Sequence, residues 1–189
     1  MITMKFAHEE LNRYLKLMTG NEQFDIKLNM DASVFDFSQF PLSKNVCYNE
    51  KLDDAYLISV HGGKGSITAT NTRAVLLGVY RFLRETGCVF LRTGEQGEII
   101  PPVKADKLNV QLTQYAQNRH RGITIEGAVS LEHLTAMVDY APKMVSTVTL
   151  YSFAQCMSSA NAGTATRITC CLSLNRLTAK RFSVYLLAK

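Results

Sequence analysis

The hydrophobic pattern near the start of the chain has the period of an α-helix. Between residues 8 and 19 the apolar positions that share one helical face are Leu11, Tyr14, Leu15 and Met18. Apolar residues spaced by three and four along the chain are typical of an amphipathic helix. The glycine that follows at position 20 is a common helix stop. We therefore expect a helix over residues 8–19.

Strand patterns follow this helix. Residues 24–30, FDIKLNM, alternate apolar and polar side chains, which is the period of a half-buried strand. Residues 55–60 and 66–70 alternate in the same way, and the glycine-rich turn at 62–65 between them predicts a β-hairpin. A second helix is expected directly afterwards, with Asn71 or Thr72 as N-cap and Gly87 as the stop.

The order of these elements predicts the domain organisation. Residues 1–107, which end with two short extended pieces and a pair of prolines, read as an α+β domain with helices on one face of a mainly antiparallel sheet. Residues 108–118 read as an extended connector. The pattern then changes to β-α-β over residues 119–153, with a strand at 122–126, a helix near 131–143 and a second strand at 146–153. A tail over residues 154–189 completes the chain.

Composition narrows the class of protein. Of the 189 residues, 47% are hydrophobic and 20% are charged, which is ordinary for a globular chain. The polar, amphipathic start and the lack of a run of 18 apolar residues favour a cytoplasmic protein without a membrane span. The five cysteines include no CxxC pair and the four histidines are scattered, so we expect no disulfide framework, no metal site and no cofactor.

The basic character of the chain comes from its end. The formal net charge is +5, yet the last fifty residues hold six of the 21 basic residues and none of the 16 acidic ones. A nucleic-acid domain usually carries its basic face on the folded core. We therefore expect neither nucleic acid nor a membrane as partner, and binding of either through the basic tail stays as an alternative.

The glycine-rich segment HGGKGS, residues 61–66, superficially resembles a phosphate-binding loop. Such a loop needs a glycine five positions before its Gly-Lys pair and a serine or threonine directly after the lysine. Here Ile58 takes the first place and Gly65 the last. The turn of a β-hairpin explains these glycines better than nucleotide binding does.

The segment RGITIEG, residues 121–127, carries the candidate binding residues. In a barrel strand, Thr124 and Glu126 would face the lumen, and Glu126 would lie at the carboxyl end where barrel enzymes place their sites. Gly127 would allow a ligand close to the backbone. Substrate binding by Glu126, Gly127 and Arg121 is one interpretation. A structural ion pair of Glu126 with Arg119 or Arg121 is the other.

Two segments resemble known carbohydrate enzymes. NTRAVLLGVYRFLRETGCVFLRTGEQGEIIP, residues 71–101, resembles the non-catalytic α+β domain that precedes the barrel in family 20 β-hexosaminidases, family 67 α-glucuronidases and related bacterial proteins. NRHRGITIEGA, residues 118–128, is similar to a first barrel strand, and its Arg-Gly and Glu-Gly pairs resemble family 84 β-N-acetylglucosaminidases. The resemblance implies a β-hexosaminidase domain-2-like fold, the beginning of a truncated (β/α)8 barrel, and a carbohydrate as the partner of the full-length relative.

The resemblance has departures. Ala128 and Val129 stand where the family 84 motif has an aromatic pair, and Thr93 stands where a proline is expected. A complete barrel needs about 250 residues, whereas 71 residues follow from Arg119 onward. Glycoside hydrolysis ordinarily uses two facing carboxyl groups, and Glu126 has no obvious second one in the barrel-like segment. No catalytic residue is therefore carried over, and the chain is expected to be an inactive N-terminal part of a glycoside hydrolase.

Two further expectations concern the tail and the barrel strands. A shift of reading frame after about Phe153 would explain the basic, cysteine-containing composition of residues 154–189. A short basic amphipathic helix that closes the domain is the alternative. Barrel strands without their neighbours would leave edges unpaired and favour self-association. A free-standing carbohydrate-binding or scaffolding module is the main alternative for function, although the chain has no tryptophan for sugar stacking.

Overall fold

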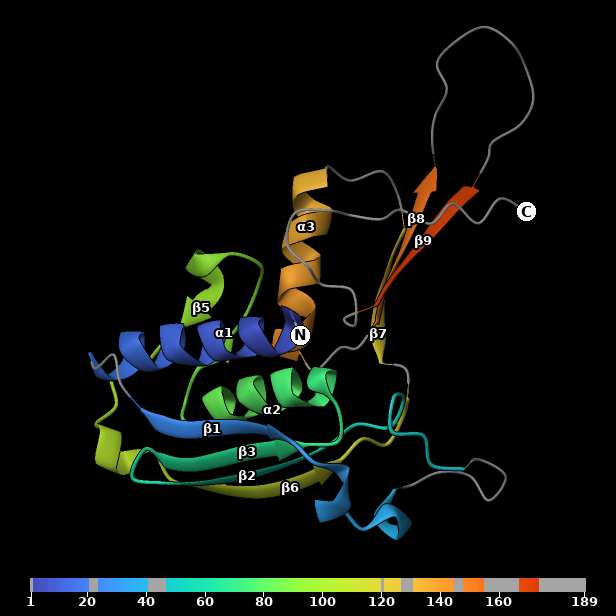
Figure 1. Cartoon of the computed structure of the whole chain (residues 1–189). Coiled ribbons are helices and arrows are strands. Elements are labelled where there is room, and N and C mark those ends of the chain that lie inside the picture. Colours follow the sequence, from blue (N-terminus) through green and yellow to red (C-terminus); the bar gives the residue numbers. More distant parts are fainter. Residues whose placement is uncertain are drawn as a thin grey trace, which may run out of the picture. The chain divides into compact units, whose positions relative to one another are not determined.

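A computed structural model of the chain describes residues 2–20, 24–40, 47–119, 121–126, 131–144, 148–154 and 167–173 (Figure 1). For residues 123–126, 131, 132, 134, 148–154 and 167–173 it describes the backbone alone. The chain divides into two compact units, unit 1 over residues 1–119 and unit 2 over residues 120–189. Each unit is described separately below.

Unit 1 is built on a four-stranded sheet. Its strands are β1 (Asp25–Met30), β2 (Ala55–His61), β3 (Lys64–Ala69) and β6 (Val110–Tyr115), in the order β1-β3-β2-β6. β2 pairs antiparallel with β3 and with β6, whereas β1 pairs parallel with β3. The sheet is therefore mixed, with two of its three pairings antiparallel.

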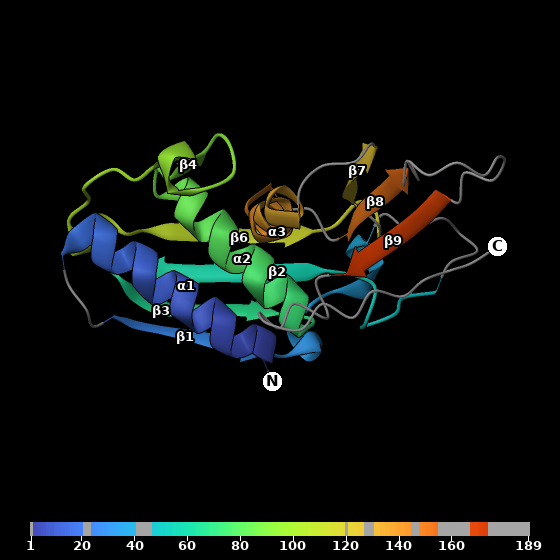
Figure 2. The same cartoon turned by 90° about the horizontal axis from the view of Figure 1, so that it is seen from above.

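Two helices cover one face of this sheet (Figures 1 and 2). They are α1 (Ile2–Thr19), which begins earlier than the sequence predicted, and α2 (Thr72–Glu85). The side chain of Asn71 accepts a hydrogen bond from the N–H of Ala74 at 2.9 Å, which confirms it as the N-cap of α2. Gly78 brings α2 close to the sheet, because an added Cβ there would lie 2.9 Å from Ile67 Cγ2.

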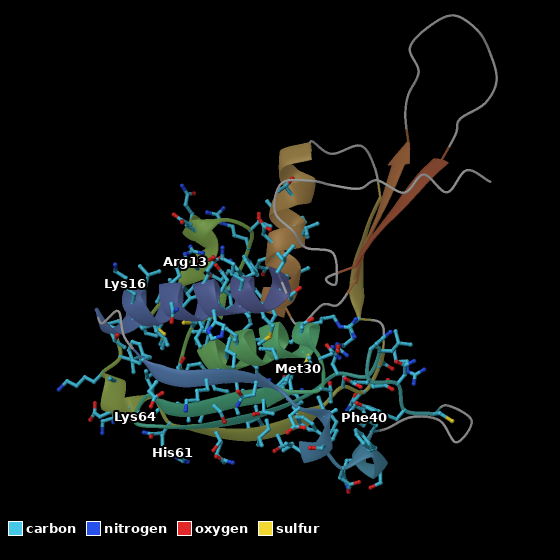
Figure 3. All side chains as sticks on the ribbon, in the orientation of Figure 1. Arg13, Lys16, Met30, Phe40, His61 and Lys64 are labelled. Carbon is cyan, nitrogen blue, oxygen red and sulfur yellow. The ribbon has the colours of Figure 1, made fainter. Side chains whose placement is uncertain are left out.

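The glycine-rich segment forms the turn of the predicted hairpin. β2 ends at His61 and β3 begins at Lys64, and Figure 3 shows both side chains beside the turn. Gly62 and Gly63 have φ angles of 57° and 74°. Two consecutive left-handed residues are typical of the tight turn that joins twisted antiparallel strands. This confirms the hairpin at the segment that superficially resembles a phosphate loop.

Short elements complete unit 1. β4 (Val89–Phe90) and β5 (Glu98–Ile99) form a separate two-stranded sheet. Single turns of 3-10 helix are η1 (Ala32–Val34), η2 (Phe37–Gln39), η3 (Glu95–Gly97) and η4 (Ala105–Lys107). None of the described helices is both long enough and apolar enough to cross a lipid bilayer.

The structure corrects the expectation that residues 108–118 form an extended connector. Its central part is β6, which pairs with β2 in the register Ile58↔Leu112. Val110 is buried in the core, and Leu112 is partly buried. Residues 110–115 pair with the edge of β2 that is not paired with β3, so this segment belongs to the sheet of unit 1.

Unit 2 contains the predicted β-α-β succession. β7 (Gly122–Glu126) pairs parallel with β8 (Val148–Ala154), and α3 (Leu131–Tyr140), extended by the 3-10 turn η5 (Ala141–Met144), lies between them in sequence. The tail, expected to break the strand rhythm, contributes β9 (Arg167–Ser173), antiparallel to β8. A barrel would continue with a parallel strand, so β9 does not continue a barrel pattern.

Candidate functional site

The candidate binding residues lie around β7. Glu126 is the last residue of this strand, and its backbone is in register with Ser152 of β8. Arg121 directly precedes the strand and is half-buried. Gly127, Ala128 and Val129 lie outside the described residues, as does the side chain of Glu126. Because β7 and β8 are parallel, their carboxyl ends lie at the same edge of the sheet, and Glu126 is at that edge.

Arg119, one of the two arginines considered as an ion-pair partner for Glu126, has another partner. Its Nε and Nη2 atoms lie 2.7 Å and 2.8 Å from the two carboxylate oxygens of Asp53. Its Nη2 group also donates to the backbone carbonyl of Cys47. The hydrogen bonds with Asp53 raise the pKa of Arg119 above its ordinary value. This guanidinium is thus committed to unit 1.

A second buried ion pair lies next to the first. Asp54 is 1% exposed and accepts hydrogen bonds from Arg73 Nη2 at 2.7 Å and from Arg73 Nε at 3.1 Å. Arg73 belongs to the first turn of α2, and its side chain is only 5% exposed. Charges buried in this way need close partners. Asp53 and Asp54 directly precede β2, and each pairs with a different arginine.

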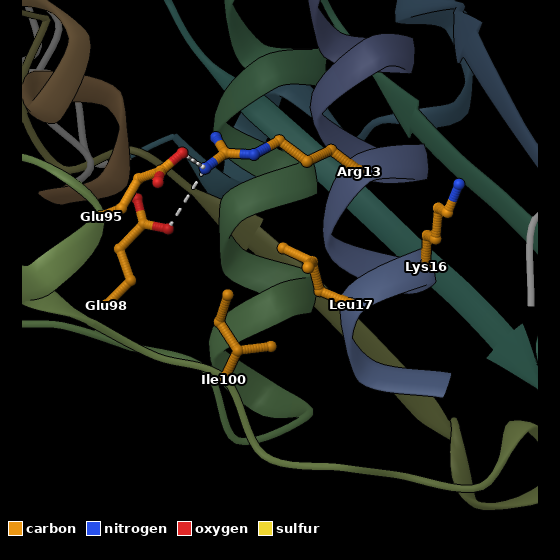
Figure 4. Close-up of a pocket in the computed structure, with 6 residues that line it drawn as sticks. All are labelled: Arg13, Lys16, Leu17, Glu95, Glu98 and Ile100. Carbon is orange, nitrogen blue, oxygen red and sulfur yellow. Dashed lines mark hydrogen bonds and ion pairs between the residues drawn. The ribbon is translucent and has the colours of Figure 1, made fainter. Parts of the chain in front are cut away.

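A surface hollow of about 460 Å³ lies between α1 and the β4–β5 region (Figure 4). Its lining residues are Arg13, Lys16, Leu17, Glu95, Glu98 and Ile100. Arg13 is the central cation, because its Nη2 atom lies 3.2 Å from Glu95 Oε1 and 3.6 Å from Glu98 Oε2. Figure 4 shows the two carboxylates converging on this guanidinium.

Two tyrosines donate hydrogen bonds to buried carboxylates, one of which, that of Glu98, lines the hollow. Tyr14 donates a hydrogen bond of 2.8 Å to Glu98, whose side chain is 4% exposed, and Tyr80 donates one of 2.6 Å to Glu10. Burial, followed by the interactions with Glu98, raises the pKa of Tyr14. Burial and the charge of Glu10 raise the pKa of Tyr80 well above its ordinary value. Both carboxylates therefore have hydrogen-bond partners within unit 1, so we assign them a structural role.

An aromatic cluster is the third notable feature. The ring of Phe37 stacks on that of Tyr48 with 4.0 Å between centroids, and Phe40 and Tyr115 pack edge to face at 5.0 Å. Phe37 remains 42% exposed. The hydroxyl of Tyr48 is buried and has no hydrogen-bond partner among the residues that the structure describes. This cluster, Phe35–Phe37–Phe40–Tyr48–Tyr115, offers one aromatic ring to solvent.

Sequence reasoning did not single out the two ion pairs or the aromatic cluster. The sequence signal for the ion pairs was Asp53 and Asp54 directly before a buried strand, followed by Arg73 in the first turn of a helix. The exposed Cys47 and buried Cys88 are both free thiols. In the part of the chain that the structure describes, no three His, Cys, Asp or Glu side chains come together in a way that could hold a metal ion.

No protein-family model, no curated protein and no solved structure matches the chain.

Proposed function

We propose that the chain is the leading part of a glycoside hydrolase and has no catalytic activity by itself. In this proposal unit 1 is the non-catalytic α+β domain and β7-α3-β8 is the beginning of the catalytic barrel. The observation that carries the proposal is the parallel pairing of β7 with β8 directly after a mixed sheet covered by two helices. Glu126, at the carboxyl end of β7, would then contact a carbohydrate.

The position of Glu126 supports a role in binding. Sites of barrel enzymes gather at the carboxyl ends of parallel strands, and Glu126 is the last residue of β7. The commitment of Arg119 to Asp53 removes one of the two arginines that would have neutralised Glu126. A carboxylate at such an edge accepts hydrogen bonds from sugar hydroxyl groups. Gly127 follows directly at this end, whereas Arg121 precedes the opposite, amino end of β7 and is therefore left out of this edge of the site.

The state of the buried carboxylates supports the absence of catalysis. Glycosidases need a carboxyl pair facing the scissile bond. In unit 1 the buried carboxylates of Glu10, Glu98, Asp53 and Asp54 are all hydrogen-bonded to a tyrosine or an arginine. β9 runs antiparallel to β8, so we exclude it from the proposed barrel. In this proposal the tail over residues 154–189 follows a shift of reading frame and lies outside the barrel, although its strand β9 pairs with β8.

The gene provides the direct test of this proposal. We expect one of the three frames after the codon for Ala154 to encode further strand–helix repeats with paired carboxylates. If no frame encodes them, the assignment to a glycoside hydrolase fails.

Ligand binding provides a second test. N-acetylglucosamine and glucuronic acid would be titrated into the full chain and followed by saturation-transfer NMR, with E126Q as the test variant and E95Q as the control. Glu95 suits this purpose because its side chain is 88% exposed. We expect weak binding that E126Q abolishes and E95Q preserves, and no hydrolysis of chromogenic glycosides. Hydrolysis by the chain would contradict the absence of activity.

The aromatic cluster favours a second candidate, a free-standing carbohydrate-binding module. Exposed aromatic rings present apolar area at the protein surface, and the C–H groups of a sugar could stack on Phe37. The same titration separates the two candidates. Under this alternative F37A abolishes sugar binding and E126Q leaves it unchanged. Under the main proposal E126Q abolishes sugar binding and F37A leaves it unchanged.

A further inference from the structure

The last residues of unit 1 make hydrogen bonds to the two residues that directly precede β2. The N–H of Ala116 donates a hydrogen bond of 2.8 Å to the carbonyl of Asp54. Three residues later, Arg119 binds both carboxylate oxygens of Asp53 and the carbonyl of Cys47. The chain is therefore held by its backbone and by a side chain shortly before β7 begins.

The acceptor of this contact is itself fixed. Asp53 is 2% exposed, and its Oδ2 atom also accepts a hydrogen bond of 2.7 Å from the N–H of Asn49. The N–H of Asp53 donates to the carbonyl of Asn49 at 2.8 Å. The neighbouring Asp54 is held by Arg73. A planar guanidinium that makes two parallel bonds to a fixed carboxylate is restrained in direction as well as distance.

We propose that the Asp53–Arg119 pair is an anchor for the first strand of unit 2. It fixes the point at which the chain leaves unit 1, and so restrains the backbone of β7, which begins three residues after Arg119. The anchor links the folded state of unit 1 to the order of the strand that ends in Glu126. This inference holds for any function of unit 2 and does not rest on the glycoside hydrolase proposal.

Hydrogen exchange of the full chain, measured by mass spectrometry, tests the anchor. R119Q removes the guanidinium, D53N/R119Q removes both charges and so leaves no unpaired buried charge, and R84Q is the control at an exposed arginine of α2. In R119Q and in the double variant we expect exchange over residues 116–126 to accelerate about tenfold, as for a local opening. Exchange in α1 and α2 should change by less than about twofold, and R84Q should match the parent chain.

Two results would overturn the anchor. In the first, exchange over residues 122–126 stays unchanged in the double variant while the variant remains folded, so that the pair has no effect on β7. In the second, α1 and α2 accelerate as much as residues 116–126, so that the pair merely stabilises unit 1 as a whole. The double variant guards against the case in which R119Q fails to fold.

Discussion

The hydroxyl group of Tyr80, on α2, donates a hydrogen bond of 2.6 Å to the carboxylate of Glu10, on α1. The two residues are 70 positions apart, and this contact joins the helices that cover the sheet. Glu10 Oε1 also lies 3.5 Å from Arg13. A buried carboxylate is thus satisfied by one hydroxyl and one cation, which makes it part of the core of unit 1.

E10Q should destabilise the protein more than E9Q. The side chain of Glu10 is 11% exposed, whereas that of Glu9 is 60% exposed and forms an exposed ion pair with Lys5 at 3.7 Å. Loss of a charged acceptor in a buried network should cost about 1–3 kcal/mol of unfolding free energy. The same change at Glu9 should stay within about 0.5 kcal/mol. Urea unfolding of both variants measures the difference, and equal effects would contradict a role of Glu10 in the core.

R73M should be among the most destabilising single changes in unit 1. It removes the guanidinium that binds the buried carboxylate of Asp54. An uncompensated buried charge of this kind costs about 3–5 kcal/mol. R84M is the matched control, because Arg84 lies on the same helix and is exposed. Thermal melting should show a large loss for R73M and little change for R84M. A small loss for R73M would contradict this prediction and would mean that the hydrogen bond from Asn71 Nδ2, at 3.0 Å, is enough for the Asp54 carboxylate.

The sequence predicted those parts of the fold whose signals are local. The hairpin turn places residues 62 and 63 in the left-handed conformation that glycine favours, and α2 has both its N-cap and its stop within its own segment, so neighbouring residues were enough. The role of residues 110–115 as β6 depends on an edge of β2 that lies some 50 residues earlier in the chain. The parallel pairing of β1 with β3 is likewise non-local. Such pairings are settled by tertiary packing.

The candidate sites likewise include features with a local sequence signal and features that depend on residues far apart in the chain. The place of Glu126 at a strand end could be predicted from the alternation within five residues. The partner of Arg119 could not, because Asp53 is 66 positions away and the local sequence offered Glu126 instead. The aromatic cluster escaped notice for a similar reason. Its members come from three separate segments, and only the folded chain brings Tyr48 and Tyr115 onto Phe40.

G65A should be far more damaging than G62N. Gly65 has a φ of 144°, and an added Cβ there would collide with the backbone carbonyl oxygen of Ser59 in the paired strand. Gly62 has a φ of 57° and no heavy atom near its Cβ position, and asparagine tolerates this left-handed conformation. We expect a loss of at least about 2 kcal/mol for G65A and of less than about 1 kcal/mol for G62N. Circular dichroism during urea unfolding would measure both, and a tolerated G65A would contradict the close approach of β3 to β2.

The protein should lose stability in alkaline solution. Burial raises the pKa of the Cys88 thiol to about 11 and raises the pKa of Tyr14, Tyr48 and Tyr80. Between about pH 9 and 11 the unfolded chain therefore releases protons that the folded chain still holds. The unfolded state then binds fewer protons, so the free energy of unfolding falls as pH rises. Below about pH 8 these groups are protonated in both states and contribute no slope.

Cys88 offers a way to isolate one part of this pH dependence. Its Sγ atom lies 3.5 Å from Met18 Sδ in the core, so C88A should lower stability at pH 7 through lost packing. C88A should also make the decline between pH 9 and 11 shallower, because one buried acid is gone. C47A, at an exposed thiol, is the matched control for the substitution. Unfolding free energies measured at half-unit intervals from pH 7 to 11 give the slopes. An unchanged slope in C88A would show that the thiol does not titrate with unfolding, and that the buried tyrosines carry the alkaline loss.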